Sequence, residues 1–335
     1  MQKPIAEVHP ELIHYTGISG LCGILQSQVL WAIHAAYLND ASELTAFKAR
    51  LPNILKPAAL EGVSALVNQN PANQEIVDRE GGLAAVAERT ANDIAIGMYD
   101  ALLGTSITDP YIEPYITSFC TTDDPLVAAH GLLSQWRGYG QDGGYALVFD
   151  TAELDSLLEK EANKWGGDLY GGNVVYSSDD DDKIREDLGE DFEEIRKCMA
   201  QWLASGGSLG GMETVYDALI HCVCRYKHWG FREEKEVRIV AIPPNKAAID
   251  HLKTRGKIVL PKPRHSFIRG GTPVPSIHLF EGITQLPETP LPIKRIIVGP
   301  HRSKNDRLRA VELLVNQHGL NIPVSVSEIP YIGLN

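Results

Sequence analysis

One segment, FREEKEVRIVAI at residues 231–242, combines charged residues with an apolar run and predicts a β-strand. Side chains on a strand alternate between its two faces, so Glu234, Glu236 and Arg238 are predicted to share one face. The two carboxylates would then lie about 7 Å apart. Burial of a carboxylate costs free energy unless a partner pairs with its charge, so an unpaired buried carboxylate indicates a functional role. The segment therefore predicts a functional centre, with a solvent-exposed ion-pair ladder at a strand end as the structural alternative.

Strand-like runs and helical stretches are interspersed along the chain and predict an α+β fold. Short apolar or β-favouring runs predict further strands at 13–16, 116–121, 145–149, 170–176, 293–298 and 324–329. The last two flank a predicted helix at 302–318 and form a strand-helix-strand unit. Stretches rich in Ala, Leu and Glu predict helical insertions at about 43–104 and 180–228. We expect these insertions to lie within a single domain over residues 1–335.

Local signals also predict where several helices begin and end. Asp150 followed by Glu153 is a capping-box pattern, and the acidic run at 179–182 suits the start of a helix. The prolines at 52–57 predict a break within the first insertion. A helix predicted at 126–136 should end at a glycine-rich loop, which is a plausible edge of a ligand site.

Composition excludes some classes of protein. The net charge of −12 disfavours nonspecific attraction to a phosphate backbone. Five cysteines in 335 residues, with no C-x-x-C pair, do not predict a disulfide framework. The N-terminal residues do not resemble a secretory or transit signal, and no apolar run reaches the roughly 20 residues of a membrane span. We therefore expect a cytoplasmic protein with no membrane partner.

Other groupings of reactive side chains predict less. His221, Cys224 and His228 are spaced for one helix face and could hold a metal, but such residues commonly fill helical cores. Ser134 and His130 could suggest a hydrolase, but no G-x-S-x-G motif accompanies them. We expect no metal ligands at the site.

A set of motifs spread over nearly the whole chain carries a family resemblance. They are Leu30-Trp31 with Leu38-Asn-Asp-x-x-Glu43, Ser134-x-Trp136-x-x-Tyr139 leading into Gly144-Tyr-Ala-Leu-Val-Phe149, His228-Trp-x-x-Arg-x-Glu-x-Glu-x-Arg238, and Ile297-Val-Gly-Pro300. Together they resemble the bacterial domain-of-unknown-function family 2971, whose name implies no activity.

A more distant resemblance concerns the order of an early His-Tyr, a mid-chain Ser-x-Trp and a late Glu-x-Glu. This order is similar to the pattern of the ADP-ribosyltransferase superfamily, which includes the DNA-modifying DarT-type toxins. The resemblance implies a split mixed β-sheet core with helical insertions, and NAD as the substrate. It implies catalytic roles for Glu236 and, as general base or acceptor-positioning group, Glu234. The implied cofactor-binding residues are His14, Tyr15, Ser134, Trp136, Tyr139, Tyr145 and Arg238.

The resulting functional expectation is an NAD-dependent ADP-ribosyltransferase or NAD glycohydrolase. Its acceptor could be a nucleic acid or a protein, in a toxin or phage-defence role. Asn39, Asp40 and Glu43 are candidate substrate-binding residues. One alternative is a metal-dependent nuclease or hydrolase that uses Asp40, Glu43, Glu234 and Glu236 as oxygen ligands. Another is a non-catalytic module that binds a ligand or a protein.

Overall fold

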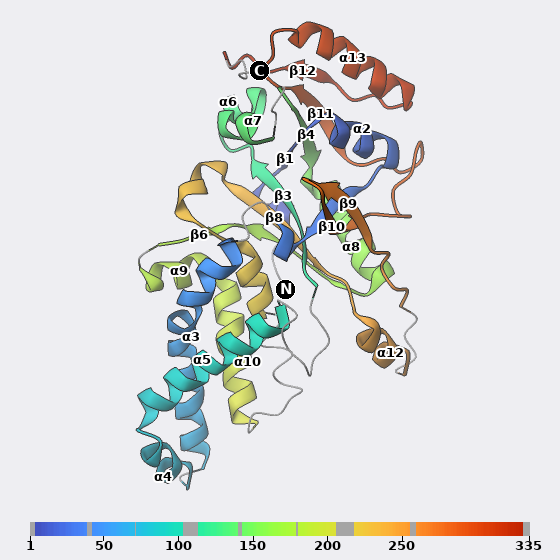
Figure 1. Ribbon diagram of the computed structural model, residues 1–335. Coiled ribbons are helices and arrows are strands. Elements are labelled where there is room, and N and C mark those ends of the chain that lie inside the picture. Colours follow the sequence, from blue (N-terminus) through green and yellow to red (C-terminus); the bar gives the residue numbers. More distant parts are fainter. Residues whose placement is uncertain are drawn as a thin grey trace. The chain divides into compact units, whose positions relative to one another are not determined.

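The chain divides into two compact units in a computed structural model (Figure 1). The structure describes residues 4–38, 42–70, 72–102, 113–139, 143–178, 180–205, 218–254 and 259–330. The sheet unit comprises Met1–Ile33, Tyr115–Asn173 and Arg232–Asn335, and the helical unit comprises His34–Pro114 and Val174–Phe231. Both predicted helical insertions fall in the helical unit.

A ten-stranded mixed sheet forms the centre of the sheet unit, which confirms a mixed α/β architecture. Its strands are β1 (Glu11–Thr16), β2 (Leu30–His34), β3 (Tyr115–Thr121), β4 (Tyr145–Asp150), β5 (Asp168–Asn173), β8 (Glu236–Ile242), β9 (His265–Arg269), β10 (Thr272–Leu279), β11 (Ile293–Val298) and β12 (Val324–Val326). The main path runs β12-β11-β4-β1-β3-β2-β10-β9, while β8 joins β3 to β5. Only the pairing of β11 with β12 is parallel among the described strand pairs of this sheet.

The sheet forks at β3. One edge of β3 pairs with β8 along Tyr115–Cys120, and the other edge is shared by β1 and β2. β1 pairs with β4 along its whole length but with β3 only at Leu12 and Ile13. β2 is tied to β3 where Thr117 Oγ1 donates to Trp31 O at 3.0 Å. Two branches therefore leave the same edge of β3, namely β1-β4-β11-β12 and β2-β10-β9.

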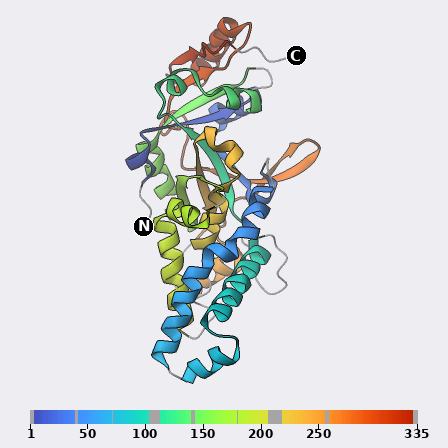
Figure 2. The same cartoon turned by 90° about the vertical axis from the view of Figure 1, so that its left-hand side faces the viewer.

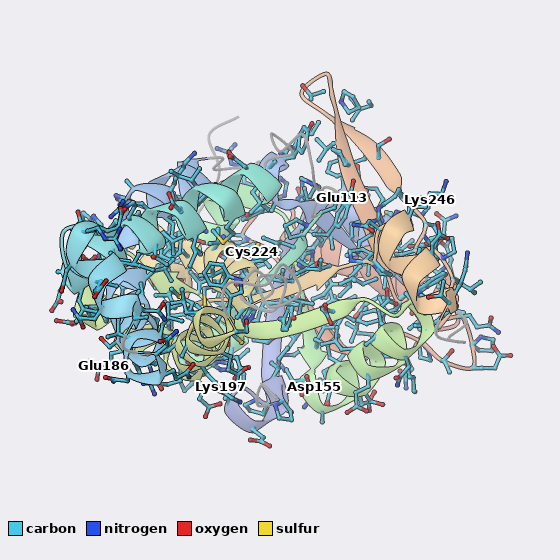
Figure 3. The ribbon with its side chains drawn as sticks, turned by 90° about the horizontal axis from the view of Figure 1, so that it is seen from below. Glu113, Asp155, Glu186, Lys197, Cys224 and Lys246 are labelled. Atoms are coloured by element: carbon cyan, nitrogen blue, oxygen red, sulfur yellow. The ribbon has the colours of Figure 1, made fainter. Side chains whose placement is uncertain are left out.

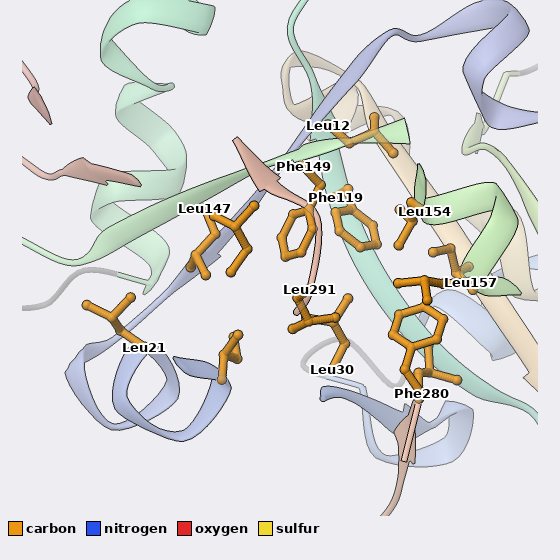
Figure 4. Packing of buried hydrophobic residues seen from close by; sticks show 14 of the residues in the cluster. Leu12, Leu21, Leu30, Phe119, Leu147, Phe149, Leu154, Leu157, Phe280 and Leu291 are labelled. Carbon is orange, nitrogen blue, oxygen red and sulfur yellow. The ribbon is translucent and has the colours of Figure 1, made fainter. Parts of the chain in front are cut away.

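Helices cover both faces of the sheet. They are α1 (Ile5–Val8), α2 (Ile18–Ser27), α6 (Pro125–His130), α7 (Leu133–Tyr139), α8 (Thr151–Trp165), α12 (Lys246–Thr254) and α13 (Lys304–Gln317). The larger apolar core lies against α2, α8 and α13, and Figure 4 shows Phe119, Phe149 and Leu154 meeting within it. A smaller core on the other face joins Ile13, Tyr15 and Cys120 to α6 and α7. Because side chains alternate between the two faces of a strand, β1, β3 and β4 each contribute residues to both cores.

Helices dominate the helical unit. They are α3 (Ser42–Gln69), α4 (Ala72–Arg79), α5 (Leu83–Leu102), α9 (Asp181–Leu188), α10 (Glu190–Ala204), the short 3₁₀ helix η1 (Ala35–Tyr37) and helical residues at 218–225. α3 packs against α5 and α10, and α3 and α5 run side by side in both Figure 1 and Figure 2. Figure 3 labels Cys224 among these helices, with Glu186 and Lys197 on their outer side. A two-stranded parallel sheet of β6 (Val175–Tyr176) and β7 (Tyr226–Lys227) completes the unit.

Several local predictions are confirmed. β11, α13 and β12 form the expected strand-helix-strand unit, with β11 and β12 parallel. Asp150 caps α8 by accepting a hydrogen bond from the Glu153 amide at 3.1 Å. Asp180 caps α9 in the acidic run. The two caps depend on neighbouring residues alone, so the sequence is sufficient to predict them.

Other local predictions are wrong. α3 continues through Pro52 and Pro57, because contacts with α5 and α10 outweigh the loss of helical hydrogen bonds. The single helix predicted at 126–136 is two helices, separated at Gly131, which has a positive φ of 75°.

No helix among the described residues is long and apolar enough to cross a bilayer.

The predicted strand at 231–242 begins at Glu236 rather than at Phe231. Residues Trp229–Glu234 form a 3₁₀ helix, η2, and Lys235 follows with a positive φ of 42°. This left-handed residue interrupts the extended backbone that alternation requires. Glu234 therefore does not belong to β8, and the prediction that it shares a strand face with Glu236 and Arg238 is wrong.

Candidate functional site

Glu236 and Arg238 form a buried ion pair on β8. Each side chain is 4% exposed, and Arg238 Nε donates to Glu236 Oε1 at 2.7 Å, with Nη2 3.3 Å from Oε2. This two-point contact fixes both the position and the plane of the carboxylate. The prediction that the two residues share one strand face is confirmed, and the ion pair explains how a carboxylate is accommodated in a buried strand.

The strand register places this ion pair two strands away from β1, across β3. Cys120 of β3 lies opposite Ile13 of β1 on one side and opposite Glu236 of β8 on the other. The three residues form one cross-strand row, so two strand spacings separate Ile13 from Glu236 by about 10 Å. Because alternation returns Tyr15 to the face of Ile13, Glu236 lies on the sheet face that Tyr15 and α7 occupy.

His14 stands at the fork of the sheet, where β1 separates from β3. Its Nδ1 lies 3.0 Å from Ser118 O, and since a carbonyl oxygen only accepts, Nδ1 carries the proton. Burial lowers the pKa of His14, against the opposing influence of the Ser118 carbonyl. The imidazole is therefore neutral near pH 7, and its Nε2 offers a lone pair. The ring contacts Phe119 at a centroid distance of 5.6 Å and stands on the face opposite to that of Tyr15.

Tyr15 connects β1 to α7. Its hydroxyl accepts a hydrogen bond from the Leu132 amide at 2.8 Å, and its ring meets the Trp136 ring edge-on at 5.0 Å. Burial raises the pKa of Tyr15, so the hydroxyl stays protonated and can donate a hydrogen bond of its own. Trp136 is 1% exposed and donates from Nε1 to His130 O at 3.0 Å. These contacts hold α7 against the face that carries Glu236.

Ser134 on α7 has a buried hydroxyl whose hydrogen-bonding capacity is unused. Its Oγ finds no hydrogen-bond partner among the residues that the structure describes. A buried hydroxyl without a partner costs about 1–3 kcal/mol, and such groups are rare outside sites of ligand binding or strain. Of the predicted cofactor-binding residues, Ser134 is the one with a buried polar atom available to a ligand.

The remaining predicted site residues have different surroundings. Tyr139 at the end of α7 is 46% exposed, whereas Tyr145 is 6% exposed and belongs to the larger core. Glu234 is half-buried at the end of η2. Glu43 lies in α3, and its side chain is outside the described residues, as are Asn39 and Asp40. The structure thus brings Glu236, Arg238, Tyr15 and α7 to one face of the sheet and His14 to the adjoining fork.

Sequence reasoning missed one group of ionisable side chains, formed by His265, His278 and Glu281. Their ligand-type atoms all lie within 4.8 Å of one another, and each residue is half-buried. The two histidines are 13 positions apart, so no local motif indicates their proximity. Only the register of β9 against β10 brings them together.

The comparison with protein families concerns the middle of the chain. Residues 135–239 match the model of a family described as a protein of unknown function, DUF2971. Trp136, Tyr139 and Glu236 lie within this segment, whereas His14 and Ser134 lie outside it. No curated protein and no solved structure matches the chain. The match supports the resemblance to the DUF2971 family that the sequence motifs indicate.

Proposed function

We propose that the residues around Glu236 bind NAD and cleave its nicotinamide–ribose bond, passing ADP-ribose to an acceptor or to water. The observation that carries the proposal is the fixed carboxylate of Glu236. Glu236 lies in one cross-strand row with Cys120 and Ile13, and His14 follows Ile13 at the fork of the sheet. A fixed negative charge stabilises the positive charge that develops on the ribose when a glycosidic bond breaks.

Glu236 would stabilise the transition state electrostatically. When the bond between ribose C1′ and the nicotinamide nitrogen breaks, its electron pair leaves with nicotinamide, which becomes neutral, and positive charge develops on the ribose. The Glu236 carboxylate is already oriented by Arg238, so little reorganisation accompanies the reaction. The acceptor oxygen or nitrogen then bonds to C1′ and loses its proton to a base, for which Glu234 is the candidate.

Three further residues would position NAD. His14 projects from the sheet face opposite to that of Glu236, so it would meet NAD at the fork of the sheet. Its Nδ1 donates to Ser118, so its Nε2 can accept a hydrogen bond there from a ribose hydroxyl or from the carboxamide. The buried Ser134 hydroxyl can supply a hydrogen bond without first breaking one within the described residues. Tyr139 is a better candidate than Tyr145 to stack on nicotinamide, because its ring is exposed and that of Tyr145 is in the core.

The neighbouring strand β5 contributes a glycine beside the ion pair. The residue opposite Arg238 on β5 is Gly172, so β5 places no side chain directly beside the guanidinium at this register. The acceptor in this proposal is a nucleic acid or a protein, in a toxin or defence role. Asn39, Asp40 and Glu43 belong to the helical unit, and their role in binding a substrate stays a prediction from the sequence.

The test is nicotinamide release from NAD by purified protein, alone and with nucleic acid or cell extract. We expect Glu236→Gln to lower the rate by about 100-fold or more. The matched control is Glu312→Gln, which changes an exposed glutamate on α13 and should leave the rate unchanged. NAD labelled in its adenylate part separates transfer to an acceptor from hydrolysis.

Folding has to be measured in the same experiment, because Glu236 is buried. Arg238→Lys keeps a positive charge next to Glu236 but loses the two-point contact, so it should lower the rate less than Glu236→Gln does. Absence of nicotinamide release by folded wild-type protein under all these conditions would contradict the proposal. It would leave a metal-dependent hydrolase, detectable by its loss of activity with EDTA, or a non-catalytic binding module.

A further inference from the structure

The branch β2-β10-β9 carries a second cluster of chemically reactive side chains, independent of the proposed NAD site. His265 begins β9 and pairs with Ser276 of β10. His278 is two residues further along β10, so both imidazoles project from the same face of the sheet as diagonal neighbours. Their rings stack at a centroid distance of 3.8 Å, with only 6° between the ring planes.

Glu281 completes the cluster from the turn after β10. Its Oε2 lies 3.1 Å from His265 Nε2. The backbone of this turn is held in place, because Lys164 Nζ donates to Glu281 O at 3.2 Å and to Gly282 O at 2.8 Å. The residue before Glu281 is Phe280, which is fully buried in the core and has a positive φ of 70°. The carboxylate is therefore presented from a constrained turn.

An aromatic wall supports the histidine pair. Trp31 of β2 lies directly opposite His278 in the register of β2 and β10, and its ring stacks on the imidazole at 5.5 Å with 11° between the planes. Phe267 of β9 contacts Trp31 at 5.3 Å. Trp31 is nevertheless 43% exposed, so the wall restricts the imidazole of His278 while the cluster remains open to solvent.

We propose that His265, His278 and Glu281 bind a divalent transition-metal ion, with zinc as the best match. Two imidazole nitrogens and a carboxylate are a common zinc ligand set that leaves the fourth position to water or a substrate. The same set suits Fe²⁺, whereas Mg²⁺ and Ca²⁺ prefer all-oxygen sites. The ligand atoms already lie within 4.8 Å of one another. Because lone pairs lie in the ring planes and the two rings are parallel, the His265 ring would have to tilt away from His278, which Trp31 holds, for both nitrogens to bind one ion.

Two lysines lie near the cluster. Lys262 is paired with Glu161, whereas the Lys164 ammonium donates to two neutral carbonyl oxygens and keeps its positive charge. Glu281 therefore supplies the negative charge. A bound divalent ion would keep a net positive charge and would favour hydroxide or an anionic ligand at its open position.

The test is zinc binding by tag-free protein, measured by competition with a chromophoric chelator. We expect wild-type protein to bind zinc, and His278→Ala and Glu281→Gln each to weaken binding by more than about 10-fold, since changing only the hydrogen-bond partners of metal ligands costs about 10–100-fold. His318→Ala, at the end of α13, is the matched control and should bind zinc as wild type does. Far-UV circular dichroism of each variant verifies its fold.

A second measurement locates the ion. Cu²⁺ quenches nearby tryptophan fluorescence, so wild-type protein should lose more emission on adding Cu²⁺ than Trp31→Phe. Because such sites bind Cu²⁺ more tightly than zinc, only a large excess of zinc should reduce the difference. Absence of zinc binding by folded wild-type protein would overturn the proposal, as would equal zinc affinity in wild type, His278→Ala and Glu281→Gln. Neither measurement uses NAD, so the results of both are independent of the proposed transferase activity.

Discussion

The Glu236–Arg238 pair and the His265–His278–Glu281 cluster are both in the sheet unit, but they satisfy their polar groups differently. The ion pair is buried and its members bond to each other at two points. The histidine cluster is half-buried, and its rings stack face to face with their nitrogens around a common space. A closed pair fixes the orientation of a charge, whereas an open cluster leaves ligand positions available. Two predictions test that difference directly, and two smaller ones test the backbone before Glu236 and the burial of His14 beside the closed pair.

The largest expected effect comes from breaking the buried pair. Glu236→Leu leaves Arg238 charged and buried without this partner, so we expect a loss of about 3–5 kcal/mol in the free energy of unfolding. The double variant Glu236→Leu/Arg238→Met should recover much of that loss, because no buried charge remains. Urea denaturation measures both. If Glu236→Leu lowers the free energy of unfolding by less than about 1 kcal/mol, Glu236 and Arg238 do not form the buried ion pair described above.

The open cluster should respond to zinc where the closed pair does not. At a free zinc concentration 100 times the dissociation constant, binding to the folded state adds about 2.7 kcal/mol to the free energy of unfolding. We expect this gain in wild type and its loss in His278→Ala, as measured by thermal denaturation with and without zinc. A gain of the same size in His278→Ala would place the stabilising ion elsewhere.

A smaller effect should distinguish a left-handed Lys235 from a residue within a continuous strand. Lys235→Ile places a β-branched side chain at a φ of 42°, so we expect a loss of about 1–2 kcal/mol in the free energy of unfolding. If β8 instead extended back through Glu234, isoleucine would suit the strand and stability would rise. Lys235→Gly is the control, because glycine tolerates a positive φ.

The smallest effect concerns pH and His14. The pKa of His14 is lowered in the folded protein by burial, so the unfolded chain binds a proton more readily. Stability is therefore complete above the ordinary pKa of about 6.5 and falls as the pH drops below it. His14→Gln keeps a donor for Ser118 O but cannot titrate. Its unfolding free energy should fall less steeply between pH 6.5 and 5 than that of wild type, with a difference in slope of at most about 1.4 kcal/mol per pH unit. Parallel pH profiles would contradict the placement of His14.

Parts of the candidate site could be predicted because they depend on a single strand. Glu236 and Arg238 are two residues apart, so alternation alone puts them on one face, and the structure confirms it. Glu234 was predicted wrongly for the same reason, since alternation holds only while the backbone stays extended, and Lys235 interrupts it. The inference from spacing fails where a single φ angle changes.

The helical unit shows the same limit in a different form. Helical composition correctly predicted that the insertions at about 43–104 and 180–228 are helical, but the break predicted at Pro52 and Pro57 does not occur. A proline removes one hydrogen bond from a helix, and the sequence shows this local penalty. The packing of α3 against α5 and α10, which outweighs the penalty, is visible only in the tertiary structure.

The sequence by itself determined the mixed α/β composition, the capped starts of α8 and α9, the strand-helix-strand unit at the end of the chain and the pairing of Glu236 with Arg238. These features arise from interactions between residues close together in the chain. The tertiary structure decided the fork at β3, the place of His14 within it and the meeting of His265 with His278 and Glu281. Those features depend on which strands pair and in what register, and register is set by burial of whole sheet faces.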